Sequence, residues 1–170
     1  YSIAMLLYEI IEETQLDIPF QIFASDLSTE AISTARIGEY TSAQVAKVNP
    51  ERLARFFTKV KNKYRIVKLL RDVCVFAHHN ILNDPPFSRM DFISCRNMLI
   101  YLDITAQKKA MATFHYALND GGCLMLGKSE TIGTLAQFFT TIDKKYKLKK
   151  KKKNTTLRSI PNLSSRNSHI

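Results

Sequence analysis

Short apolar runs that end abruptly in polar residues recur along the chain. They are typical of strands, and they lie at residues 20–26, 73–80, 90–95 and 121–127. Segments with helical spacing lie between them, at residues 29–37, 51–57 and 105–118. Strands that alternate with helices predict an α/β fold, with a mostly parallel sheet covered by helices on both faces.

Turn signals fix several of the expected boundaries. Ser28 and Thr29 are good residues for a helix start after the first run. The sequence Asn-Asp-Gly-Gly at residues 119–122 predicts that the helix over 105–118 ends in a left-handed residue. The strand over 121–127 would begin directly after that turn.

The stretch from Met90 to Tyr101 carries the most information about function. Its apolar first half is strand-like, whereas Arg96 and Asn97 are costly to bury unless other groups pair with them. Residues just past the carboxyl end of a strand face the ligand crevice in an open α/β sheet. We therefore expect Arg96, Asn97 and Tyr101 to serve recognition. The alternative is a helix N-terminus with Asn97 as its cap.

The cysteines and histidines do not suggest a metal site. Cys74, Cys95 and Cys123 are widely spaced and lie in predicted strands, which fits free thiols in a reducing cytosol. The neighbours His78 and His79 would point to opposite faces of a strand. No apolar run approaches the roughly 20 residues of a membrane span, and no signal peptide is visible. A cytoplasmic protein without metal and without membrane insertion is expected.

The net charge of +10 comes entirely from the last part of the chain. Residues 144–170 hold eight Lys, two Arg and no acid, whereas residues 1–143 hold 15 basic and 15 acidic residues. Residues 151–170 are interpreted as a basic and polar linker or tail. Aromatic residues are absent beyond Tyr146, so nucleic acid is not the expected partner.

A second charge asymmetry lies inside the neutral part. Between Lys47 and Arg71 there are nine basic residues and one acid, Glu51, and the rest of residues 1–143 carries a charge of −8. We call residues 47–71 the basic segment. It is either a solvated face that acids of the same chain compensate, or a docking surface for an acidic partner.

Several short sequence motifs resemble those of the chemotaxis receptor methyltransferases, the CheR family. They follow the family's order over residues 1–150, and they lie at residues 1–7, 22–27, 35–40, 80–82, 95–103 and 121–130. The motif Cys-Arg-Asn-Met-Leu-Ile-Tyr at residues 95–101 is the one most specific to this family. The resemblance implies a Rossmann-like fold and S-adenosylmethionine as the cofactor, which becomes S-adenosylhomocysteine. It implies methyl esterification of glutamates on receptor signalling helices, with these receptors as partners.

The resemblance also gives roles to the strand ends. Asp26 looks like the acid that accepts hydrogen bonds from the ribose hydroxyls. Asn80 and Ile81 look like the adenine contacts. Arg96 and Asn97 look like a pair that lines the cofactor site.

Two residues are implied to act at the reacting groups. Tyr101 looks like the aromatic residue beside the transferred methyl. Arg96 would hold either the acceptor carboxylate or the carboxylate of the cofactor, and the sequence does not decide between them.

The chain departs from the family pattern at two places. It begins at Tyr1-Ser2, after the family's first strand and its glycine-rich loop, so the first strand is expected to be missing. Residues 1–150 would then be an incomplete catalytic domain that alone binds S-adenosylmethionine weakly and is inactive. The small inserted subdomain expected at residues 41–72 also lacks the glycine turn that some relatives use to bind a receptor pentapeptide.

Two other functions remain open. One is an S-adenosylmethionine transferase that acts on a small molecule, although the motif at residues 95–101 argues against it. The other is a degenerate methyltransferase module that serves as a sensor or scaffold in a larger signalling protein.

Overall fold

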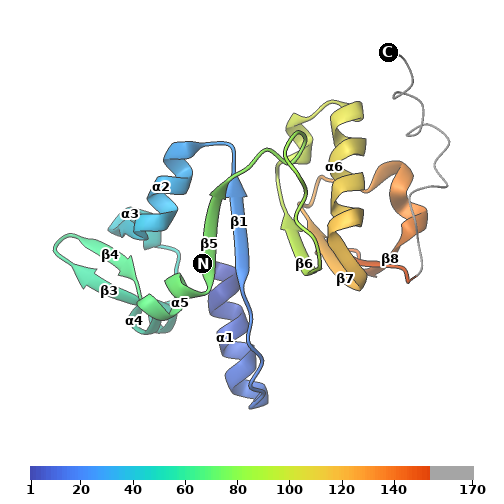
Figure 1. Ribbon diagram of the computed structural model, residues 1–170. Coiled ribbons are helices and arrows are strands. Elements are labelled where there is room, and N and C mark those ends of the chain that lie inside the picture. Colours follow the sequence, from blue (N-terminus) through green and yellow to red (C-terminus); the bar gives the residue numbers. More distant parts are fainter. Residues whose placement is uncertain (154–170) are drawn as a thin grey trace. The chain divides into compact units, whose positions relative to one another are not determined.

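The computed structural model describes residues 1–153, except for the side chain of Thr134 (Figure 1). The chain divides into two compact units, and the second begins at Ile81. Each unit has its own buried core, and each is described by itself.

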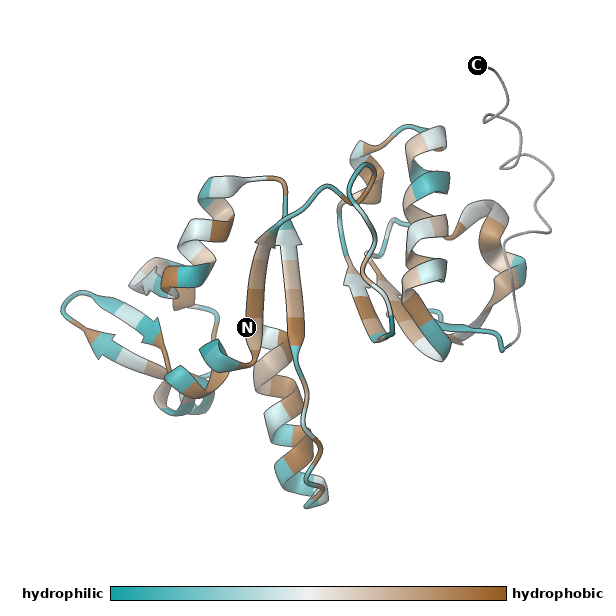
Figure 2. Cartoon of the chain, viewed as in Figure 1, coloured by the Kyte–Doolittle hydropathy of each residue, from teal (hydrophilic) through white to brown (hydrophobic). Residues whose placement is uncertain are grey.

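The first unit contains a pair of parallel strands with helices and a small antiparallel sheet. Its elements are α1 (Ser2–Thr14), β1 (Ile22–Asp26), α2 (Thr29–Ile37), β2 (Glu39–Thr41), α3 (Ser42–Val45), α4 (Pro50–Phe56), β3 (Phe57–Val60), β4 (Lys63–Ile66), α5 (Lys68–Asp72) and β5 (Cys74–His78). Strand β1 pairs with β5 in parallel, from Ile22 opposite Cys74 to Asp26 opposite His78. Both strands are predominantly hydrophobic in Figure 2.

Local signals in the sequence explain the helix that follows β1. The Ser28 hydroxyl accepts a hydrogen bond from the backbone N–H of Ala31, which caps the start of α2. Gly38 ends the helix in the left-handed conformation with φ of 66°. The helix predicted over residues 29–37 is therefore confirmed, and it begins shortly after Asp26, the last residue of β1.

The antiparallel sheet has the strand order β2-β4-β3. Strands β3 and β4 form a hairpin whose turn is Lys61 and Asn62, with Val60 opposite Lys63. Lys61 takes the positive φ of 53° that glycine would adopt more easily. The core of the unit packs between this sheet, α1 and α5 around Phe56 and Leu70.

The second unit is built on a mixed sheet. Its elements are β6 (Met90–Cys95), the 3-10 helix η1 (Leu99–Tyr101), α6 (Ile104–Ala117), β7 (Leu118–Leu126), the 3-10 helix η2 (Gly133–Phe138), β8 (Phe139–Asp143) and β9 (Leu148–Lys151). The strand order is β6-β7-β9-β8, in which β6 and β7 are parallel and the other neighbours are antiparallel. Phe114 of α6 and Leu124 of β7 lie in its core.

The expected glycine stop at the end of α6 is wrong. The C-cap is Leu118 in an extended conformation, and the chain passes directly into β7. Gly121 does take a positive φ of 78°, but it does so inside β7, where the pairing with β6 shifts register. The buried Lys151 ammonium donates to the carbonyl oxygens of His115 and Leu118, each at 2.7 Å. A cation from a distant strand thus satisfies the end of this helix.

The α/β class is confirmed, as are the strands expected at residues 20–26, 73–80, 90–95 and 121–127, the last of which begins earlier than expected, at Leu118. A single, mostly parallel sheet is not observed, because residues 1–153 form one parallel pair, one antiparallel sheet and one mixed sheet. The antiparallel strands β8 and β9 were not expected as a hairpin. Helix α1 was not expected either. No helix among the described residues is long and apolar enough to span a membrane. Of the expected tail at residues 151–170, positions 154–170 lie outside the described residues.

Candidate functional site

Asp26 and Asn80 lie at the same end of the parallel pair in the first unit. Asp26 is the exposed last residue of β1, and Asn80 follows β5 by two residues and is half-buried. Asp26 Oδ1 accepts a hydrogen bond of 2.8 Å from the backbone N–H of Ser28. The same carboxylate thus orders the turn into α2 and remains accessible at the carboxyl end of the strands.

Arg96 and Asn97 directly follow β6 in the second unit, and both are exposed. Asn97 takes the left-handed conformation with φ of 60°, which asparagine tolerates better than most residues. The residue that precedes η1 is Met98, without a side-chain cap. The alternative in which Asn97 caps a helix is therefore wrong, and the polar pair stands on a sharp turn at the strand end.

Tyr101 and Ile81 differ in their surroundings. Tyr101 ends η1 and is 82% exposed, so its ring is available to a ligand or a partner. Ile81 is partly buried and packs against the core of the second unit. An apolar side chain held in this way can pack against one face of a planar ring.

The six predicted site residues are divided between the two units. The first unit holds Asp26 and Asn80, and the second holds Ile81, Arg96, Asn97 and Tyr101. A carboxylate suits the vicinal hydroxyls of a ribose, amides and an apolar face suit a purine, and a guanidinium suits a carboxylate. The carboxylate and amide of the first unit suit an adenosine, and the guanidinium and amide of the second unit suit the amino acid part of an adenosyl cofactor.

Glu130 is a buried acid for which the sequence analysis predicted no role. Its side chain accepts hydrogen bonds from the backbone N–H groups of Met98, Leu99 and Gly127 at 2.8, 2.7 and 2.6 Å. Burial raises the pKa of the neighbouring Cys95 thiol to about 12, and the Glu130 carboxylate adds to the rise. Cys95 is thus an inert core residue. The sequence signal for Glu130 was the Gly-Lys-Ser-Glu word after β7, but spacing alone could not reveal its partners.

Acidic residues of the first unit neutralise part of the positive charge of the basic segment. Four of its cations form ion pairs, namely Arg52 with Glu9, Arg55 with Glu12, Arg65 with Glu39 and Lys68 with Asp72. The hydrogen bonds from Arg52 lower the pKa of the Glu9 carboxyl. Lys59, Lys61 and Lys63 are exposed on the β3–β4 hairpin, and they take part in none of these four ion pairs.

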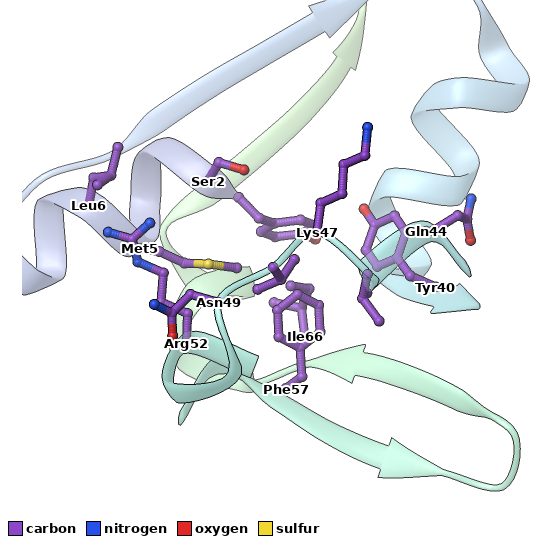
Figure 3. A pocket seen from close by; sticks show the side chains of 13 residues that line it. Ser2, Met5, Leu6, Tyr40, Gln44, Lys47, Asn49, Arg52, Phe57 and Ile66 are labelled. Atoms are coloured by element: carbon purple, nitrogen blue, oxygen red, sulfur yellow. The ribbon is translucent and has the colours of Figure 1, made fainter. Parts of the chain in front are cut away.

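A cavity of about 390 Å³ lies in the first unit between α1, α4 and the small sheet (Figure 3). Met5, Phe57 and Ile66 contribute apolar surface to its lining, and the cations Lys47 and Arg52 line it as well. None of the six predicted site residues lines it. This cavity is therefore not the place at which the sequence predicts the cofactor.

Residues 1–153 contain no cluster of three metal-ligating side chains. The three cysteines are free, and Cys74 and Cys95 are buried.

Comparison with known proteins points to one family. Residues 1–148 match the family described as "CheR methyltransferase, SAM binding domain". The chain is 31% identical over 147 residues to "Chemotaxis protein methyltransferase Cher2" of Pseudomonas putida, which covers 84% of the chain and 54% of that protein. It is 37% identical over 148 residues to an uncharacterized 104.1 kDa protein of Rhodobacter capsulatus, which covers 87% of the chain and 16% of that protein.

The chain therefore spans about half the length of the chemotaxis methyltransferases that it matches, and a smaller part of the Rhodobacter protein. Among solved structures, the N-methyltransferase NodS of Bradyrhizobium japonicum is similar at 15% identity with a TM-score of 0.45, over 78% of this chain and 74% of that one.

Proposed function

Because the chain belongs to the CheR methyltransferase family and its cofactor is S-adenosylmethionine, we propose that it esterifies glutamate side chains of chemotaxis receptors. The observation that carries the proposal is the family match over residues 1–148. The name of the Pseudomonas relative supports chemotaxis as the setting. Methylation of receptor helices would take place in the cytoplasm.

The reaction requires little acid–base catalysis by the protein. The cofactor supplies a methyl group on a sulfonium sulfur, activated for transfer. A glutamate has a reference pKa of about 4.3, so the acceptor is already ionised at neutral pH and needs no general base. The chain's own residues would have to hold both reactants in line and exclude water. Good alignment alone lowers a barrier by roughly 7–11 kcal/mol in favourable systems.

The residues at the strand ends of the first unit would bind the adenosine part. The exposed Asp26 carboxylate would accept hydrogen bonds from the ribose hydroxyls. Asn80 would read the edge of the adenine ring, and Ile81, the first residue of the second unit, would pack on its face. The strand-end positions of Asp26 and Asn80 support this assignment.

The turn after β6 would serve the reacting end of the cofactor. Arg96 would hold a carboxylate, Asn97 would donate and accept hydrogen bonds beside it, and Tyr101 would border the transferred methyl. The exposure of all three side chains supports these roles, because a ligand can reach them. Arg96 and Tyr101 are the residues proposed to take part in catalysis.

We also propose a finer architecture for residues 1–150, namely one Rossmann-like catalytic domain with an inserted subdomain at residues 41–72. Among the described residues, β1 pairs only with β5, and β6 pairs only with β7. Each parallel pair therefore keeps an edge strand to which a further strand can add. Such an addition would extend a parallel pair toward the mostly parallel sheet that the family resemblance implies.

The β3–β4 hairpin is proposed as the docking surface for receptors. Lys59, Lys61 and Lys63 are exposed on it, whereas other cations of the basic segment are paired with acids of the same unit. Receptor helices that present several methylatable glutamates are acidic, so the hairpin complements them in charge.

A second candidate is a degenerate module that acts as a sensor or scaffold in a larger signalling protein. The observation in its favour is that the chain matches only 16% of the Rhodobacter protein, so a similar segment lies within a much longer chain there.

Cofactor binding separates the two candidates. The full-length protein should bind S-adenosylhomocysteine with a micromolar dissociation constant in calorimetric titration, because an enzyme of this family must hold its cofactor whereas a degenerate module need not. A folded full-length protein that shows no heat of binding at millimolar S-adenosylhomocysteine would contradict the enzyme and favour the scaffold.

A further inference from the structure

We infer that Glu130 is a positioning residue that holds Asn97 and the start of η1 in the shape that the cofactor requires. The inference rests on the proposed function, because it assumes that the turn after β6 meets the cofactor. Glu130 itself touches neither reactant in this account. It acts through the backbone of the turn.

The carboxylate joins two segments that are distant in the sequence. One oxygen, Oε1, accepts from the N–H groups of Met98 and Leu99, which lie 32 and 31 residues earlier. The other oxygen, Oε2, accepts from the N–H of Gly127, and the Glu130 N–H donates to the Gly127 carbonyl at 3.0 Å. The side chain thus ties the loop after β7 to the residues that directly follow Asn97.

Gly127 lies in close contact with both Asn97 and Glu130. A Cβ atom at Gly127 would lie 2.7 Å from Asn97 Oδ1, 2.7 Å from Glu130 Oε2 and 2.9 Å from the Asn97 backbone nitrogen. Only glycine lets the three residues approach so closely. Asn97 is therefore held from two sides, by this contact and by the hydrogen bonds to the next two residues.

The burial of Glu130 shows that these bonds matter to the local structure. The residue is 3% exposed, and a buried carboxylate is costly unless strong donors surround it. Three backbone N–H groups meet this requirement. The same bonds satisfy the first N–H groups of the 3-10 turn, which lacks a side-chain cap from its own N-terminal residue.

Substitution of Glu130 by glutamine removes one acceptor without changing the shape of the side chain. An amide has a single oxygen, so its NH2 group must face either Gly127 N–H or the N–H groups of Met98 and Leu99. In the full-length protein, Glu130→Gln should speed amide exchange at Met98 and Leu99 and raise the dissociation constant for S-adenosylhomocysteine about tenfold. Glu130→Asp keeps both oxygens on a shorter stem and should recover part of the affinity.

The control is Asp103→Asn, which removes one carboxylate charge from the same unit. Asp103 caps α6 by accepting from Ala106 N–H at 2.8 Å, and asparagine caps equally well. This variant should bind S-adenosylhomocysteine as the wild type does. If Glu130→Gln fails to fold, Gly127→Ala provides the second test, because its Cβ should displace Asn97 and weaken binding by a similar factor.

The measurement is calorimetric titration of S-adenosylhomocysteine, with amide exchange of each variant recorded below its melting temperature. If folded Glu130→Gln binds with wild-type affinity, the inference is overturned and the carboxylate is purely structural. If that variant does not fold, wild-type affinity in folded Gly127→Ala has the same meaning. Absence of binding in the wild type would instead refute the proposed function, and the inference would fail with it.

Discussion

Replacement of Asp26 by alanine should weaken the binding of S-adenosylhomocysteine to the full-length protein by about 1–3 kcal/mol, because hydrogen bonds to a charged acceptor are lost. This corresponds to a dissociation constant roughly five- to 150-fold higher. The exposed position of Asp26 at the end of β1 makes the carboxylate accessible to ribose hydroxyls. Calorimetric titration measures the effect directly.

Two companion variants separate ribose binding from local folding. Asp26→Asn can keep the hydrogen bond from Ser28 N–H through its amide oxygen, but it loses the charge and the second acceptor. It should therefore bind weakly without a change in melting temperature. Asp17→Ala removes an exposed acid from the same unit and should have no effect. Wild-type affinity in Asp26→Asn and Asp26→Ala would show that the ribose assignment is wrong.

Reversal of charge on the β3–β4 hairpin should slow receptor methylation. With Lys59, Lys61 and Lys63 replaced by Glu, the rate at low substrate concentration should fall about tenfold or more in low salt, since steering of this kind raises association rates 10- to 1,000-fold. At about 20 mM salt the Debye length is roughly 20 Å, and the difference should shrink as salt approaches physiological strength. Initial rates with receptor membranes at several salt concentrations measure this.

The matched control changes the same number of charges in the second unit. Lys108, Lys109 and Lys144 are exposed there, and their replacement by Glu should leave the rate nearly unchanged. Both triple variants should bind S-adenosylhomocysteine normally. Equal rates for the hairpin variant and the wild type at low salt would mean that the basic segment is only a solvated, compensated face.

The order of strands and helices could be predicted where the signals are local. Ser28 and Gly38 mark the two ends of α2, and the helix lies where they place it. Asp26 ends a strand, and Arg96 and Asn97 directly follow one, because the change from apolar to polar residues marks strand ends well.

The features that escaped prediction depend on contacts over long sequence distances. The carbonyl oxygens at the end of α6 accept hydrogen bonds from Lys151, which is more than 30 residues away. No residue near Leu118 in the sequence indicates this partner. The division into separate sheets also escaped prediction, because strand pairing is a property of the whole chain. A run of lysines gives no sign that one of them is buried.

The candidate site could be predicted in part. Polarity alone pointed to Arg96, Asn97 and Tyr101, whereas the roles of Asp26, Asn80 and Ile81 came from resemblance to a family. Glu130 could not be assigned from spacing, since its acceptor role appears only when Met98 and Leu99 are brought next to it.

Methyl transfer to receptor glutamates is the most direct test of the central claim. Full-length protein, radiolabelled S-adenosylmethionine and membranes that contain chemotaxis receptors should yield label on receptor glutamates. The label should be released as methanol by mild base, because methyl esters hydrolyse there, and it should be lost when the acceptor glutamates are replaced by alanine. Label that resists base, or no label above that of boiled protein while the cofactor product still binds, would contradict the account.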